Sequence, residues 1–140
     1  LTRLHDLGVQ PFLTAATILG VLAQRLVRQL CPHCKKKTHI NEDEWEHLTF
    51  DYIMEMPETV YQAVGCEECR HTGYKGRVGI YEFMPVSLEL KHLISSHVTL
   101  NDLRTQTKKE GIEPLRIAGA RKVIEGLTTL EEVLRVVPLN

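Results

Sequence analysis

Apolar residues recur at helical spacing near the start of the chain. Pro11 suits the first turn of a helix, and the positions that follow it at this spacing are Phe12, Ala15, Ala16, Leu19 and Ala23. The pattern predicts a helix that begins at Pro11. The next segment, residues 24–30 (QRLVRQL), has no clear period, so it either extends this helix or forms a strand.

The middle of the chain opens with the acidic run NEDEWEH. Residues 41–64 contain this run, a proline and scattered aromatic residues, which together predict a short helix, a turn and a strand. Trp45, Phe50 and Tyr52 lie in this segment. They could form a binding surface, but a small module needs such side chains to cover its own core, and we favour the core.

Residues 71–83 (HTGYKGRVGIYEF) combine three glycines with β-branched and aromatic residues. This composition predicts a turn that leads into a strand. The glycine spacing matches neither G-x-G-x-x-G nor G-x-x-x-x-G-K-[ST], so the glycines are interpreted as turn residues and not as a phosphate cradle.

From Pro85 onward the apolar residues return to helical spacing. Ser87 is the expected cap of a first helix, Thr99 begins a second that stops at Gly111, and Pro114 opens a third. The apolar positions of the first and third helices are Leu90, Leu93, Ile94 and His97, then Ile117, Ala120, Ile124 and Leu127. His97 has no second metal-type residue beside it, so it is interpreted as a packed histidine.

A capping-box pattern marks one more helix at the end of the chain. Thr129 and Glu132 form this pattern, and the apolar positions that follow it are Leu130, Val133, Leu134 and Val137. The helices of the tail therefore predict a small bundle with a core of its own.

Length and charge limit the possible classes of protein. The chain has 140 residues and 43% hydrophobic content, enough for one domain with a small appended module. Its net charge of -1 disfavours nucleic acid as a partner. The most apolar stretch, residues 11–23, is shorter than the ~20 residues that a membrane span needs. The chain opens without a methionine or a signal-like leader, which suggests a fragment.

Two CxxC pairs contain all four cysteines, Cys31 with Cys34 and Cys66 with Cys69. Disulfides, a redox pair and a metal site are three possible uses. Disulfides suit secreted proteins, and a redox CxxC normally stands alone, so a metal site is favoured. Four thiolates in two knuckles suit tetrahedral Zn²⁺. The loop between the knuckles, residues 35–65, is longer than in a compact zinc ribbon.

Basic residues lie close to both knuckles in the sequence. Four thiolates around Zn²⁺ carry a net charge of about -2, which nearby cations would offset. The candidate cations are Lys35, Lys36, Lys37, Arg70 and Lys75. A docking patch for an acidic partner is the less favoured interpretation. His33 and His71 are expected at the surface or behind the ligands, because four cysteines already complete the coordination.

Four stretches of the chain resemble one known family. They are TRLHDLGVQPFL, AQRLVRQLCPHC, GCEECRHTGYKGRVGIYEF and GLTTLEEVL. In these stretches the chain is similar to the C-terminal part of the ATPases of type II secretion and type IV pilus assembly. The resemblance spans nearly the whole chain.

The resemblance implies an α/β fold, more narrowly an α+β fragment, in four parts. Residues 1–30 would be the last elements of a RecA-like core, 31–70 a tetracysteine zinc module, 71–85 a strand that returns to the core, and 86–140 a helical bundle. The zinc ligands implied are Cys31, Cys34, Cys66 and Cys69. Arg25 and Arg77 match arginine positions near the motor core, with no contact assigned.

The resemblance also implies the setting of the whole motor. This would be a homo-hexamer, peripheral at the cytoplasmic face of the inner membrane, that uses ATP and Mg²⁺ to drive secretion or pilus extension. Its partners would be the inner-membrane platform and cytoplasmic-domain proteins of the machine.

One departure from the family pattern is decisive for catalysis. The sequence contains neither the Walker A loop nor the Walker B segment, so no catalytic residue is assigned and the chain alone is expected to be inactive. A zinc-stabilised interaction module that stands alone, without a catalytic role, is the alternative function.

Overall fold

A computed structural model describes residues 1–97 and 99–137; the last three residues of the predicted tail lie outside this range. The chain divides into two compact units. The first unit contains Leu1–Ala23 and Glu82–Glu113, and the second contains Gln24–Tyr81 and the described residues from Pro114 onward.

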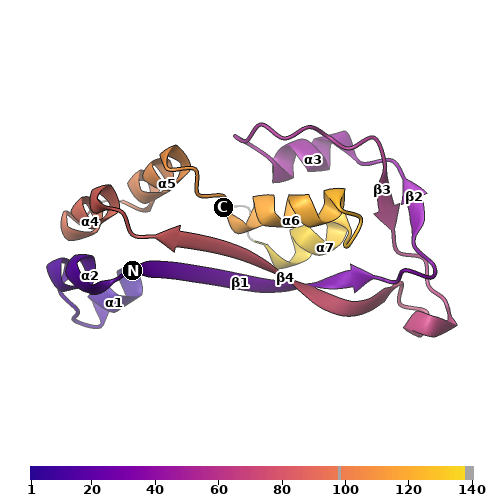
Figure 1. The fold of residues 1–140 in the computed structure, drawn as a ribbon, viewed down its shortest axis with the longest axis horizontal. Coiled ribbons are helices and arrows are strands. Elements are labelled where there is room, and N and C mark those ends of the chain that lie inside the picture. Colours follow the sequence, from indigo (N-terminus) through magenta and orange to yellow (C-terminus); the bar gives the residue numbers. More distant parts are fainter. Residues whose placement is uncertain (98, 138–140) are drawn as a thin grey trace. The chain divides into compact units, whose positions relative to one another are not determined.

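The order of the elements is mixed α and β, as the sequence predicts (Figure 1). The helices are α1 (Thr2–Asp6), α2 (Pro11–Thr17), α3 (Glu42–Leu48), the short 3₁₀ helix η1 (Glu67–Cys69), α4 (Leu88–Ser95), α5 (Leu100–Lys109), α6 (Leu115–Ile124) and α7 (Leu130–Val136). The strands are β1 (Gly20–Leu30), β2 (Lys36–Thr38), β3 (Val60–Gln62) and β4 (Tyr74–Pro85). Among the described residues, no helix combines the length and the apolar character that crossing a bilayer requires.

The strands form two separate two-stranded sheets. In one sheet β1 pairs with β4, and in the other β2 pairs antiparallel with β3, with Lys37 opposite Tyr61. Backbone hydrogen bonds continue the β1–β4 pairing past the strand ends: Val86 N–H donates to the Leu19 carbonyl (3.0 Å) and Cys31 N–H to the Gly73 carbonyl (3.0 Å). The two long strands are therefore paired at both of their ends.

The first unit forms around the contact between α2 and α4. Thr14 and Ala15 of α2 and Leu90 and Ile94 of α4 are buried there. The Ser87 hydroxyl accepts a hydrogen bond from Leu90 N–H (3.1 Å), which confirms the predicted cap of α4.

Helix α5 begins where the sequence predicts. Thr99 and Asp102 form a reciprocal capping box, in which each side chain accepts a backbone N–H of the other residue. At the other end of the helix, Ser87 donates its hydroxyl to the carboxylate of Glu110 (2.6 Å). This bond connects the start of α4 with the end of α5.

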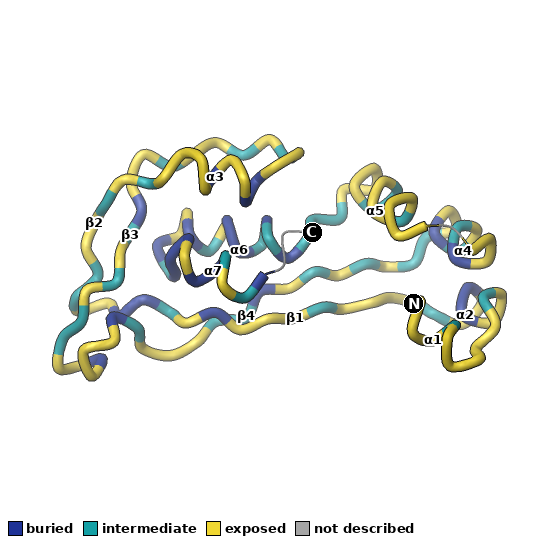
Figure 2. Tube along the Cα trace, turned by 180° about the vertical axis from the view of Figure 1, so that it is seen from behind, coloured by how far each residue is buried: buried dark blue, intermediate teal, exposed yellow. Residues whose placement is uncertain are grey.

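The second unit packs α6 and α7 against α3, and α6 also contacts β3. Its largest buried side chains include Val27, Leu48, Ile80, Ile117, Val123, Glu132 and Val133. Figure 2 shows buried stretches along α6 and α7, whereas β1 is exposed over most of its length. The tail helices are thus divided between the two units, and α6 and α7 share their core with the cysteine-bearing segment.

Glycine permits the close approach of α6 to α7. A Cβ atom added to Gly119 would lie 2.4 Å from the Cγ1 of Val133, nearer than carbon atoms can approach. Helix α6 therefore contains Gly119, despite the low helix propensity of glycine, because the side chain of Val133 occupies the space that a Cβ at position 119 would need.

Several predictions from the apolar pattern are wrong in detail. Leu19 and Ala23 do not continue the first helix, because α2 ends at Thr17 and the chain enters β1 at Gly20. Ile18 and Val21 are β-branched, and pairing with β4 supplies the hydrogen bonds that a helix would have supplied. Residues 24–30, whose spacing of apolar residues does not distinguish a helix from a strand, lie in β1.

Other side chains that the sequence predicts to be packed are exposed. Phe50 is 72% exposed just after α3, although Trp45 of the same segment is only 2% exposed. Ile124 is exposed on α6, because Val123 faces the core instead. His97 lies beyond the end of α4 with a positive φ of 55°, and its ring is 6.1 Å from the ring of His5.

Candidate metal centre

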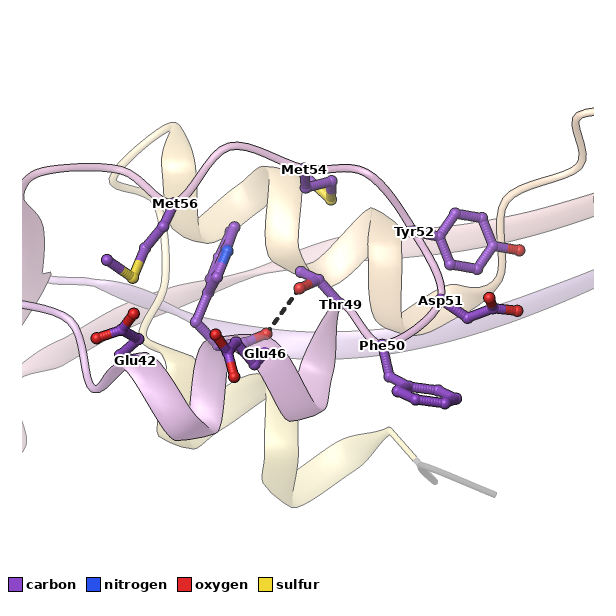
Figure 3. A pocket seen from close by; sticks show the side chains of 9 residues that line it. Glu42, Glu46, Thr49, Phe50, Asp51, Tyr52, Met54 and Met56 are labelled. Atoms are coloured by element: carbon purple, nitrogen blue, oxygen red, sulfur yellow. Dashed lines mark hydrogen bonds between the residues drawn. The ribbon is translucent and has the colours of Figure 1, made fainter.

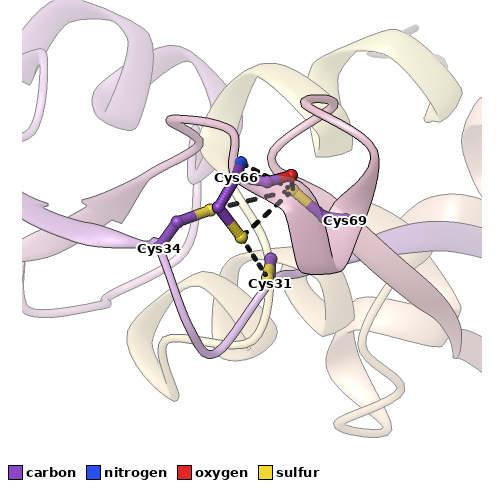
Figure 4. A group of neighbouring side chains, drawn as sticks. All are labelled: Cys31, Cys34, Cys66 and Cys69. Atoms are coloured by element: carbon purple, nitrogen blue, oxygen red, sulfur yellow. Dashed lines mark hydrogen bonds between the residues drawn. The ribbon is translucent and has the colours of Figure 1, made fainter.

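The ends of the two long strands carry the four cysteines into one cluster (Figure 4). Cys31 directly follows β1, and Cys34 lies one turn later, where Lys35 N–H donates to the Cys31 carbonyl (3.1 Å). Cys66 caps η1 and Cys69 ends it, five residues before β4 begins. The cluster therefore holds together the two ends of the segment that leaves β1 and returns to β4.

The spacing of the sulfur atoms fits a tetrahedral metal ion. Three pairs of Sγ atoms lie 3.8 Å apart, namely Cys31 with Cys66, Cys34 with Cys69, and Cys66 with Cys69. All four sulfurs lie within 4.8 Å of one another. A ZnS₄ tetrahedron with Zn–S distances of about 2.3 Å has edges of about 3.8 Å. Disulfides are absent, since all four cysteines are free.

Backbone N–H groups point at the sulfurs and favour their ionised form. Gly65 N–H donates to the Sγ of Cys34 (3.3 Å), and the N–H groups of Cys66 and Gly73 both donate to the Sγ of Cys69 (3.2 Å each). Burial opposes ionisation of Cys69, but the two N–H groups and the neighbouring thiols lower its pKa to about 6.

The pKa of the Cys66 thiol shifts in the opposite direction. Burial raises its pKa to about 11, a hydrogen bond with the Cys69 backbone opposes the rise, and the three other thiols add to it. Four thiols this close cannot all ionise without a cation among them, because like charges repel at short range. The donor set and its backbone hydrogen bonds thus fit a divalent soft metal such as Zn²⁺.

Two glycines make these N–H···S contacts possible. Gly65 and Gly73 have positive φ angles of 117° and 82°. An added Cβ would lie 2.9 Å from the carbonyl oxygen of His71 at Gly65 and 2.6 Å from the Cβ of Ala63 at Gly73. The glycine spacing predicts Gly73 only as a turn residue, although a glycine beside a CxxC pair is also a signal for close approach of the backbone to the sulfurs.

The basic residues near the two cysteine pairs make different contacts. Lys35 donates to the carbonyl of Gly126 (2.9 Å) and lies 4.3 Å from the ring centroid of Tyr61, so it ties the end of α6 to β3. Lys75 pairs with Glu68 at 3.6 Å, beside Cys69. His33 and His71 are exposed, and the clustered metal-ligand atoms belong to the four cysteines alone among the described residues.

The two arginines singled out by the resemblance do not join the metal cluster. Both are exposed; Arg25 donates to the carbonyl of Gln24 (2.8 Å), and Arg77 lines a shallow pocket of about 350 Å³ with Arg28 and Tyr74. The guanidinium of Arg28 stacks 4.2 Å from the ring centroid of Tyr74.

Arg28 and Glu132 form an ion pair (2.9 Å) that the sequence pattern does not predict. The Thr129 hydroxyl accepts from Glu132 N–H (3.1 Å), which is half of the predicted capping box. The carboxylate turns instead to Arg28 on β1 and Arg135 on α7. A glutamate at a position of the inward helical face, followed by an arginine three residues later, is the sequence signal for such a buried pair.

The chain is a mixed α/β protein in which four clustered cysteines, next to the ends of two paired strands, could hold a metal ion. Residues 1–135 match the family model described as type II/IV secretion system protein. The chain belongs to this family.

Several curated relatives are similar along almost the whole chain. The type IV pilus assembly ATPase TfpB of Acinetobacter baylyi is 70% identical over 140 residues, 100% of this chain and 24% of that protein. Type II secretion system protein E of Pseudomonas aeruginosa is 44% identical over 97% of this chain and 26% of its own length. The type IV pilus assembly ATPase PilB of Thermus thermophilus is 38% identical over 96% of this chain and 15% of its own length. The chain thus spans about a quarter or less of these relatives.

Proposed function

We propose that the chain is the C-terminal part of an ATPase that powers type II secretion or type IV pilus extension. The observation that carries this proposal is the similarity to such ATPases along 96 to 100% of the chain. The parent is a cytoplasmic homo-hexamer peripheral at the inner membrane, and it binds ATP and Mg²⁺ through segments outside this chain.

Exposed apolar side chains on the long strands support a larger parent. Leu22 is 61% exposed and Leu26 is 46% exposed on β1, and Phe83 is 57% exposed on β4. Rows of such residues on a two-stranded sheet are costly in water, and further elements of an ATPase domain would cover them.

In this proposal Zn²⁺ is structural. Bound to Cys31, Cys34, Cys66 and Cys69, it holds together the points where the chain leaves β1 and returns to β4. Residues 35–65, which we call the zinc lobe, then form outside the ATPase core. Such a lobe suits docking to the inner-membrane platform or cytoplasmic-domain proteins of the machine, and not chemistry.

The test is complementation of a bacterium that lacks the parent ATPase. A longer protein carrying this chain is supplied with Cys66→Ser or with the control His33→Ala, because His33 is exposed and outside the metal cluster. We expect Cys66→Ser to abolish secretion or piliation and His33→Ala to leave it unchanged. Normal output from Cys66→Ser would contradict the structural role of the metal.

The docking role has a separate test. The exposed residues Lys36, Glu42 and Glu44 of the zinc lobe are replaced together by alanine in the longer protein. We expect assembly output to fall while the ATPase rate and melting temperature stay unchanged, since surface changes usually cost less than about 0.5 kcal/mol. Normal output with normal stability would leave the zinc lobe as structural support only.

A further inference from the structure

The chain between the two cysteine pairs concentrates negative charge. Nine of the 18 acidic residues lie between Lys37 and Arg70, and neither lysine nor arginine occurs between those two positions. The nine are Glu42, Asp43, Glu44, Glu46, Asp51, Glu55, Glu58, Glu67 and Glu68. Because the whole chain has a net charge of only -1, this segment is a local feature that needs its own explanation.

A pocket of about 360 Å³ lies within this acidic segment (Figure 3). Its apolar lining residues are Trp45, Phe50, Met54 and Met56. Figure 3 shows Glu42 and Glu46 on α3, below the stretch of chain that carries Met54 and Met56. The Thr49 hydroxyl donates to the Trp45 carbonyl (2.8 Å) and holds the end of the helix at the edge of the pocket.

The indole N–H of Trp45 has no hydrogen-bond partner within the described part of the chain. Trp45 is 2% exposed, and its Nε1 is buried. Buried tryptophan N–H groups normally find an acceptor. The two methionines beside it are flexible side chains that can move to admit an occupant carrying a carbonyl oxygen.

The pocket combines apolar surface with acidic charge. Phe50 is 72% exposed, and Ile53, between Phe50 and Met54 in the chain, is fully exposed at 107%. Glu42 and Glu46 are exposed as well, and among the described residues neither lysine nor arginine lines the pocket, although Arg116 lies 5.1 Å from the ring centroid of Tyr52. An anionic lipid surface would be repelled by this segment, whereas a cationic segment with an apolar residue matches both features.

We propose that this pocket docks a lysine- or arginine-rich amphipathic segment of a partner protein. An apolar side chain of that segment packs against Phe50, Met54 and Met56, which line the pocket with the buried Trp45, and its flanking cations pair with Glu42 and Glu46. The existence of such a partner rests on the proposed function, but the chemistry of the segment rests on the pocket alone.

Trp45 also supplies the probe for the experiment, because it is the only tryptophan of the chain. The metal-loaded chain is titrated with a short synthetic peptide of lysine, leucine and phenylalanine patterned as an amphipathic helix, and Trp45 fluorescence reports binding. We expect saturable binding that weakens as salt rises. The absence of binding at millimolar peptide and low salt would overturn the proposal.

Matched variants distinguish specific binding at this pocket from general electrostatic attraction to the acidic segment. We expect Glu42→Gln with Glu46→Gln to raise the peptide Kd by about tenfold or more. Glu55→Gln with Glu58→Gln removes two acidic residues of the same segment that do not line the pocket, and we expect a change of less than about twofold. Equal weakening by both pairs would overturn the proposal in favour of diffuse attraction.

The peptide and the oligomeric state provide two more controls. Replacing every lysine of the peptide by glutamate, or every apolar residue by serine, should abolish binding; tight binding by either peptide contradicts the proposal. A second copy of the chain is another possible occupant, with Lys36 and Lys37 as its cations. If the chain self-associates and Glu42→Gln with Glu46→Gln abolishes that association, a second copy of the chain, and not a partner protein, occupies the pocket.

The outcomes distinguish this inference from the proposed function. If Cys66→Ser abolishes assembly but the peptide does not bind, only the inference about the pocket fails. If the peptide binds with the expected charge dependence but Cys66→Ser supports normal assembly, only the proposed role of the metal fails.

Discussion

The carboxylate of Glu132 accepts three hydrogen bonds from Arg28: two from the guanidinium (2.9 and 3.2 Å) and one from the backbone N–H (3.0 Å). The glutamate side chain is 1% exposed, and Arg135 adds two further hydrogen bonds from its own helix. The Thr128 hydroxyl donates to the Arg28 carbonyl (2.8 Å). Helix α7 is thus attached to β1 by a buried, fully paired carboxylate.

We predict that Glu132→Gln destabilises the second unit by about 2 to 3 kcal/mol. A buried carboxylate that loses its charge leaves two guanidinium groups without their partner, although both are partly in solvent and recover some hydration. Urea unfolding at pH 7 measures the loss. The control is Glu131→Gln, an exposed neighbour on the same helix that should change stability by less than about 0.5 kcal/mol. Equal effects of the two substitutions would contradict the role of the pair.

The stabilisation by Glu132 should depend on pH in one direction. Burial opposes ionisation, but hydrogen bonds from Arg135 and Arg28 lower the pKa of Glu132 from 4.5 to about 2. Because the folded pKa is the lower one, the stabilisation is complete above the unfolded value and is lost as the pH falls towards 2. The stability difference between the wild-type chain and Glu132→Gln should be constant from pH 8 to pH 5.5 and shrink below pH 4.5. A difference that grows in acid would refute this assignment.

We predict that the purified chain holds one Zn²⁺ and that chelation unfolds the second unit first. Binding of a structural metal is coupled to folding and is worth on the order of 10 kcal/mol. Elemental analysis measures the metal, and Trp45 emission, which shifts to the red on exposure, reports the unfolding. Amide signals of α6 and α7 should be lost with those of α3, because these helices share one core.

The first unit is the internal control for chelation. The buried contact between α2 and α4 contains no cysteine, so the amide signals of these two helices should persist. Simultaneous loss of all signals would mean that the two units unfold together, and full retention of α6 and α7 would mean that the metal does not support their core.

We predict that Gly119→Ala is destabilising by about 1 to 3 kcal/mol, although alanine is the better helix former. The added methyl group overlaps the Cγ1 of Val133. Thermal unfolding of Gly119→Ala, Val133→Ala and the double variant tests this, because Val133→Ala makes room for the new methyl group. The double variant should lose less stability than the two single changes together, and strictly additive losses would contradict the contact.

We predict that the chain alone has no ATPase activity above background. Phosphoryl transfer depends on a phosphate-binding loop and Mg²⁺ ligands, and the sequence contains neither Walker motif. Phosphate release is measured for the chain and for a longer protein that includes the segments before it. Turnover by the chain in a clean preparation would disprove the prediction, and activity in the longer protein alone agrees with it.

Local chemistry determined what the sequence could reveal. The caps at Ser87, Thr99 and Thr129 were readable because a capping side chain bonds an N–H group three residues away. The spacing of each CxxC pair likewise places two sulfurs on one side of an ion. These features depend on neighbours in the chain, so the residue order contains them.

Tertiary structure decided the features that depend on distant partners. Residues 20–30 became a strand because β4 supplies its hydrogen bonds, and Glu132 left its capping role because Arg28, 104 residues away in the chain, approaches it. The division of the tail helices, the exposure of Phe50 and the pocket beside Trp45 also follow from which surfaces meet. Hydrophobic periodicity predicts which side chains are buried, but only tertiary packing determines in which of the two cores each one lies.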